Sequence, residues 1–173
     1  MDTSIFYMDE QVTLSSFLTT VTAFLAGFIF ILGAARLTKI RQQYYTFGIG
    51  LFFLTLAFDE YFEVHPYVNT LIKSTHGGAL GYLAEISWVF PLFIFVVLVG
   101  VLFVLFIKNI KTRNVRMPFL IGMGCYMLVL ILEIIGGNTY GQDIYIWFVG
   151  LEEGFEMIGG SLFLLSALNV YEK

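Results

Sequence analysis

Five long apolar runs constrain the fold of this chain more than any other feature. Each run approaches or exceeds the roughly 20 helical residues that cross about 30 Å of bilayer hydrocarbon. The runs cover residues 12–36, 44–63, 82–107, 117–135 and 144–171. Because backbone polar groups in lipid must be satisfied within the spanning segment, these runs predict helices. We therefore expect an all-α integral membrane protein, with five transmembrane helices in a single domain over residues 1–173.

Composition agrees with this expectation. Hydrophobic residues make up 58% of the chain and charged residues only 13%, with a mean hydropathy of +0.85, whereas soluble domains carry about 25% charged residues. The net charge of −4 argues against a nucleic-acid partner. The single cysteine, Cys125, excludes an intramolecular disulfide and a zinc finger. The expected surroundings are the lipid bilayer of a cell membrane, with a homo-oligomer or a larger membrane complex left open.

Basic residues predict the orientation. Lys and Arg concentrate in the cytoplasmic loops of membrane proteins. Only Lys73 lies on one side of the predicted bundle; the other basic residues lie on the opposite side, at Arg36, Lys39, Arg41, Lys108, Lys111, Arg113, Arg116 and Lys173. The sequence therefore predicts an outside N-terminus and a cytoplasmic C-terminus.

Small residues predict two faces of close helix packing. In the first run, Ser16, Thr20, Ala23 and Gly27 follow one another at roughly helical spacing. In the last run, Gly150 and Gly154 form a G-x-x-x-G step. Because small residues let helix backbones approach closely in membranes, we expect both faces to contact neighbouring helices.

Acidic residues converge on the outer half of the predicted bundle. They lie within the spans or at their ends, as Asp59, Glu60, Glu63, Glu85, Glu133, Glu152, Glu153 and Glu156, and two histidines, His65 and His76, lie on the same side. A charged carboxylate facing lipid costs up to about 2.5 to 3.5 kcal/mol at mid-bilayer. These groups therefore require a bound cation, protonation with mutual hydrogen bonds, or a water-filled cavity, and each remedy predicts an inward-facing polar pocket.

Carboxylates with imidazole predict a divalent metal as one occupant of this pocket, either Fe, Mn or Zn. The first candidate ligands are Glu60, His65, Glu153 and Glu156, with Glu133 and Asp59 as further ligands or orienting partners. A second tier of pocket residues contains Glu63, Glu85, Glu152 and His76. The chain has no Glu-x-x-His motif, which the di-iron and di-manganese bundles carry.

Three classes of function stay open at this stage. A metal-dependent enzyme would activate water or oxygen on a lipid-soluble substrate. A proton or cation relay would use the same carboxylates without a metal. A structural accessory subunit of a membrane complex would use them only to hold helices together. A retinal pigment is excluded because no span contains a lysine deep enough for a Schiff base.

Two motifs carry a family resemblance. Asp59, Glu60, Phe62 and His65 form D-E-x-F-x-x-H, and residues 151–159 read L-E-E-G-F-E-M-I-G. The chain thereby resembles a largely uncharacterised family of small prokaryotic multi-span membrane proteins with D-E-x4-H and L-E-E-G-x-E-x-x-G motifs. Pro66 stands where that family tends to carry a second glutamate. The resemblance implies importance for Asp59, Glu60, His65, Glu153 and Glu156 and implies no activity.

Overall fold

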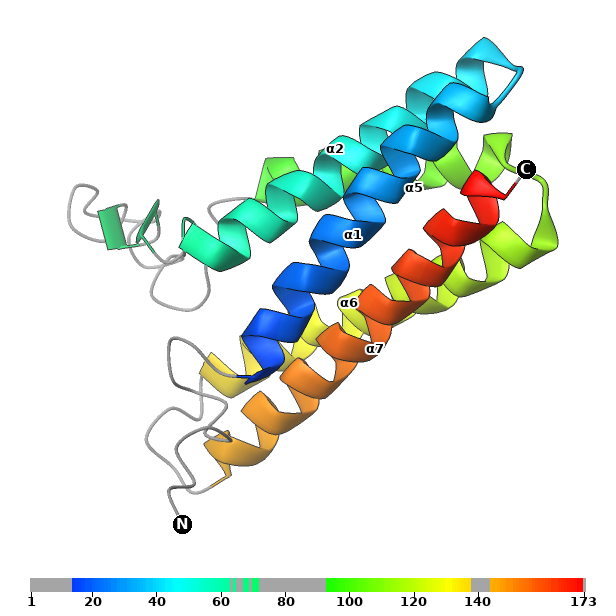
Figure 1. The fold of residues 1–173 in the computed structure, drawn as a ribbon. Coiled ribbons are helices and arrows are strands. Elements are labelled where there is room, and N and C mark those ends of the chain that lie inside the picture. Colours follow the sequence, from blue (N-terminus) through cyan, green and yellow to red (C-terminus); the bar gives the residue numbers. More distant parts are fainter. Residues whose placement is uncertain are drawn as a thin grey trace.

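The computed structural model describes residues 14–62, 64, 67–68, 70–71, 93–137 and 144–172. Its long helices, shown in Figure 1, are α1 (Leu14–Arg36), α2 (Ile40–Phe62), α5 (Phe93–Asn109), α6 (Arg113–Gly137) and α7 (Tyr145–Tyr171). Within the described ranges three helices are long and apolar enough to cross a membrane, namely Leu14–Arg36, Arg113–Gly136 and Tyr145–Tyr171. The all-α fold class is therefore confirmed.

Helix boundaries differ from the apolar runs at the starts of two helices. α2 begins at Ile40 and α6 at Arg113, each four residues before the predicted run. The added segments contain arginine and glutamine, which are good helix formers although they are not apolar. An apolar run therefore marks only the hydrophobic part of a helix. Of the third predicted span, residues 82–92 lie outside the described residues.

α1 lies at the centre of the helix packing. It contacts both α2 and α7, while α6 packs against α7 and α5 packs against α2. At the crossing of α1 and α2, a Cβ atom on Gly27 would lie only 2.8 Å from the carbonyl oxygen of Gly50. The predicted close approach at Gly27 is thus confirmed. Ala23 is buried on the same face, whereas Ser16 and Thr20 are only half-buried.

The second predicted packing face is wrong at Gly154. A Cβ atom at that position would meet no other atom within 4 Å. The close approaches of α7 occur instead at Gly159 and Gly160, where a Cβ would lie 2.8 Å from the Tyr126 ring and from the Thr22 hydroxyl oxygen, respectively. The reason is the position of the crossing, because α6 and α1 pass nearest to α7 about one turn further along the helix.

Six phenylalanines form an aromatic layer across the middle of the bundle. These rings come from all five helices, and the layer consists of Phe30, Phe53, Phe103, Phe106, Phe119 and Phe163. Ring centroids lie 4.6 Å apart between Phe106 and Phe119 and 4.7 Å apart between Phe53 and Phe163. Because all six side chains are buried and interlocked, the layer leaves the centre of the bundle filled with apolar atoms.

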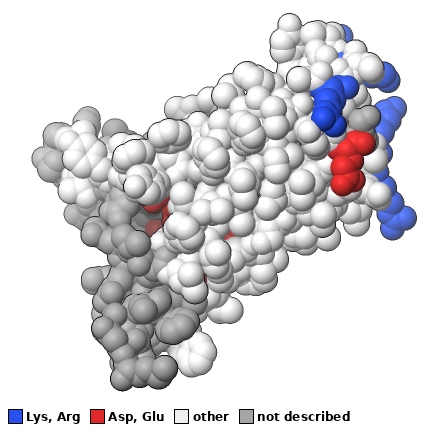
Figure 2. Space-filling view, viewed as in Figure 1, with Lys and Arg blue, Asp and Glu red and all other residues white. Residues whose placement is uncertain are grey.

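The basic residues gather at one end of the bundle, which we call the basic end. Every Lys and Arg that the structure describes lies in or beside the short turns that end α1 and α5 (Figure 2). There, Arg36 of α1 donates hydrogen bonds to the carbonyl (3.1 Å) and hydroxyl (2.7 Å) oxygens of Tyr171. On the face shown in Figure 2, an uncharged surface lies between this end and the acidic side chains toward the opposite end of the bundle.

Candidate functional site

Five glutamates from three helices approach one another in the half of the bundle opposite the basic end. Glu60 is near the end of α2, Glu133 is near the end of α6, and three more are near the start of α7. All are half-buried. We call this set the carboxylate cluster, and it consists of Glu60, Glu133, Glu152, Glu153 and Glu156. The antiparallel course of α7 relative to α2 and α6 brings their acidic ends together.

A hydrogen bond joins two of these carboxyl groups. The side chains of Glu133 on α6 and Glu152 on α7 are hydrogen-bonded to each other. Two ionised carboxylates have only acceptor oxygens, so one member of such a pair must carry a proton. Such a pair therefore joins α6 to α7 only when one of its carboxyl groups is protonated.

Glu153 accepts a hydrogen bond from a side chain of α1. The side chain of Ser15 hydrogen-bonds to Glu153, and the hydroxyl is the donor because a carboxylate only accepts. The second carboxyl oxygen of Glu153, Oε2, is buried and has no hydrogen-bond partner in the described part of the chain. A buried oxygen of this kind requires a donor or a cation to offset its lost hydration.

Glu156 occupies the middle of the cluster. It lies within electrostatic range of Glu60, Glu133 and Glu153. At 1.5 Å per residue it is about 17 Å along α7 from Tyr145, close to the middle of this helix of about 40 Å. Within the described ranges no Lys or Arg lies in this half of the bundle. The described residues therefore place no Lys or Arg side chain beside the cluster.

Tyr126 is a further member of the site. Its ring packs against Phe163 of the aromatic layer with centroids 5.5 Å apart. Its hydroxyl oxygen is buried without a hydrogen-bond partner among the described residues, and it lies within electrostatic range of Glu156 and Glu60. Sequence reasoning missed Tyr126. The available signal was a tyrosine in mid-span, since a buried hydroxyl usually has a polar partner.

The other sequence-predicted site residues are distributed as follows. Asp59 is half-buried next to Glu60 on α2. Glu63, His65, His76 and Glu85 lie outside the described residues. Over the ranges that are described, no group of three or more His, Cys, Asp or Glu side chains is arranged to hold a metal ion. The described carboxylates alone therefore do not fit an Fe, Mn or Zn site.

The aromatic layer lies between the carboxylate cluster and the basic end. Phe163 follows Glu156 by two helical turns, and Phe53 precedes Glu60 by two turns. On α6, Phe119 precedes Tyr126 by the same interval. The six buried rings therefore lie about two helical turns from the carboxyl groups, and at their level the centre of the bundle is filled with aromatic side chains.

Comparison with known proteins identifies the family. Neither a search of curated proteins nor a search of solved structures finds a match to this chain. A match to a family does exist, and it extends over nearly all of the sequence. Of the resemblance stated above, membership of an uncharacterised family is confirmed. Since the family described as a domain of unknown function (DUF8692) matches residues 3–170, the chain belongs to that family.

Proposed function

We propose that this is a multi-pass cell-membrane protein that binds protons in its carboxylate cluster from one side of the membrane. The hydrogen bond between Glu133 and Glu152 carries this proposal, because it needs a proton to exist. The remaining acids of the cluster supply further proton acceptors in the same low-dielectric space.

The proposed topology has five membrane spans, with the basic end in the cytoplasm and the cluster in the outer half. Three helices meet the length and apolarity needed for a span. α2 is as long as α1, but its ends carry Arg41 and Gln42 on one side and Asp59 and Glu60 on the other. Polar ends of this kind suit the two interfaces of a bilayer, and the distribution of Lys and Arg favours a cytoplasmic basic end.

The aromatic layer favours binding over transport. A relay that carries protons across a membrane needs a polar path on both sides of its acidic site. Beneath Glu156 the path meets buried phenylalanine rings instead. We therefore propose that protons enter and leave the cluster by the same side.

A divalent metal is a weaker candidate than a proton. The described side chains do not form a metal-binding group, so a metal would require His65 or Glu63, which lie outside the described residues. In its favour, Glu153 Oε2 is buried without a hydrogen-bond partner in the described ranges and would suit a hard cation. The experiment below separates the two candidates.

The test combines infrared titration with elemental analysis on the full chain purified without chelator. Acidification should raise the C=O band of protonated carboxyl groups, and Glu156→Gln should reduce that change. The matched control is Glu172→Gln, which removes an exposed carboxylate at the basic end. In liposomes, an imposed pH difference should decay no faster than in empty vesicles.

Three results would overturn the proposal. A wild-type protein without a titrating carboxyl band has no proton-binding cluster. A stoichiometric metal that is lost in the Glu153→Gln/Glu156→Gln double variant would establish the metal site instead. Fast proton flux that depends on Glu156 would show a transmembrane relay.

A further inference from the structure

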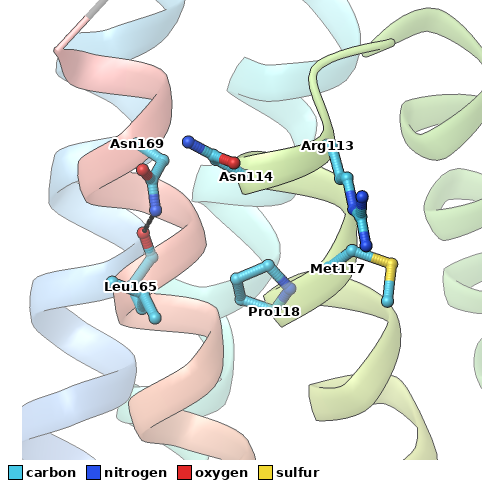
Figure 3. A pocket seen from close by; sticks show the side chains of 6 residues that line it. All are labelled: Arg113, Asn114, Met117, Pro118, Leu165 and Asn169. Carbon is cyan, nitrogen blue, oxygen red and sulfur yellow. Dashed lines mark hydrogen bonds between the residues drawn. The ribbon is translucent and has the colours of Figure 1, made fainter.

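A groove lies between α6 and α7 at the basic end, far from the carboxylate cluster. It has a volume of about 410 Å³ and is formed by the first two turns of α6 and the last two turns of α7. Six side chains line it (Figure 3), namely Arg113, Asn114, Met117, Pro118, Leu165 and Asn169. It is an open depression on the surface, not an enclosed cavity.

The groove has a polar end and an apolar end. Asn114 and Asn169 lie across from each other at the polar end, and Pro118 and Leu165 lie below them (Figure 3). The amide of Asn169 donates a hydrogen bond of 2.7 Å to the Leu165 carbonyl oxygen. A ligand that fits both ends must therefore be amphipathic.

Arg113 gives the groove a positive charge, and its guanidinium group lies beside Met117 and not beside the two asparagines (Figure 3). It is exposed, and none of the carboxylates that the structure describes pairs with its guanidinium group. Arg116, Lys111 and Lys108 lie within a few residues of it. An anionic headgroup is the complement of such a site, because a guanidinium binds phosphate through two parallel hydrogen bonds.

Pro118 adds a hydrogen-bond acceptor. Its ring nitrogen carries no hydrogen, so the Asn114 carbonyl, four residues earlier in α6, receives no helix hydrogen bond from that position. A carbonyl oxygen that lacks its helix donor needs a hydrogen-bond donor from elsewhere. A headgroup with a hydroxyl beside its phosphate would supply that donor, whereas the cationic choline of a zwitterionic lipid would face Arg113.

We propose that this groove binds one anionic phospholipid, with its phosphate on Arg113 and the start of one acyl chain over Met117, Pro118 and Leu165. The inference rests on the membrane insertion and orientation proposed above, since these put the basic end at the level of cytoplasmic headgroups. It does not depend on what the carboxylate cluster binds.

The test is native mass spectrometry of the full chain in detergent with equal amounts of phosphatidylglycerol and phosphatidylcholine of identical acyl chains. We expect phosphatidylglycerol to be retained about fivefold more than phosphatidylcholine, the effect of about one surface charge contact. Arg113→Gln should remove that preference. The matched control is Arg41→Gln, which removes another exposed charge at the basic end outside the groove and should change retention less than about twofold.

A second variant tests the apolar end without changing charge. Leu165→Trp should fill the groove and reduce retained phosphatidylglycerol to the level of Arg113→Gln, with an unchanged helical circular-dichroism spectrum. If Arg113→Gln and Arg41→Gln lose equal amounts of phosphatidylglycerol, the total positive charge of the basic end would explain the retention, and the proposal would be overturned. Equal retention of the two lipids by the wild type, or full retention by Leu165→Trp, would also overturn it.

Discussion

At the scale of residues, the carboxylate cluster shows which side-chain contacts a sequence can predict. Glu60, Glu133, Glu153 and Glu156 were expected together because the predicted helices put all four in the same half of the bundle, and these glutamates do approach one another. The hydrogen bond from Ser15 to Glu153 and the position of Tyr126 were not predicted. Both contacts depend on how α1 and α6 are rotated about their own axes. The spacing of apolar residues does not predict that rotation, because these helices are apolar on nearly every side.

The Glu133–Glu152 hydrogen bond leads to a prediction on stability. Glu133→Gln should leave the unfolding free energy nearly unchanged, because the amide N–H replaces the shared proton as the donor. Glu133→Ala should lower it by about 1 kcal/mol, the range measured for polar contacts between membrane helices. Thermal unfolding in detergent gives both values.

A double-mutant cycle controls for effects that do not involve the pair. Glu133→Ala and Glu152→Ala should show a coupling of about 0.6 to 1.7 kcal/mol. Strictly additive losses would mean that the two carboxyl groups do not interact.

At the scale of elements, the helices follow from the apolar runs, but their crossings do not. The close approach at Gly27 was predictable from a series of small residues. The close approach at Gly159 and Gly160 was not predictable, because Gly150 and Gly154 form an equally good small-residue pattern in the same helix. Which glycine is used depends on where the neighbouring helix passes.

Substitution of glycine by alanine should distinguish used from unused positions. Gly27→Ala should lower the unfolding free energy by about 1 to 3 kcal/mol, because its Cβ would lie 2.8 Å from backbone atoms of α2. Gly124→Ala is the matched control, since a Cβ there meets nothing within 4 Å. It should be neutral or stabilising by up to about 1 kcal/mol through helix propensity. Similar losses at both positions would contradict the close crossing of α1 and α2.

At the scale of the whole molecule, charge separation is the dominant feature, and it was readable from the sequence. The described Lys and Arg side chains lie at the basic end, and the clustered glutamates lie in the opposite half. The aromatic layer between them was not predicted, because the chain has 19 phenylalanines and their spacing alone does not reveal which six meet.

Cysteine labelling tests the proposed orientation. The native Cys125 is buried, so it contributes little background to a membrane-impermeant thiol reagent. Thr38→Cys, in the exposed turn between α1 and α2, should react only from the cytoplasmic side. Ile144→Cys, exposed at the start of α7, is the complementary variant and should react only from outside. Reaction of both from one side would contradict the proposed topology.

In the proposed topology, the depth of Glu156 in α7 has an electrical consequence. A proton that reaches the middle of a membrane from outside crosses about half of the transmembrane voltage. A full elementary charge is worth about 2.3 kcal/mol per 100 mV, so half the field contributes about 1 kcal/mol per 100 mV, or roughly fivefold in proton affinity. A cell with a negative interior would therefore favour protonation at Glu156, and depolarisation would release the proton. The buried glutamate would thus report membrane voltage as well as external acidity.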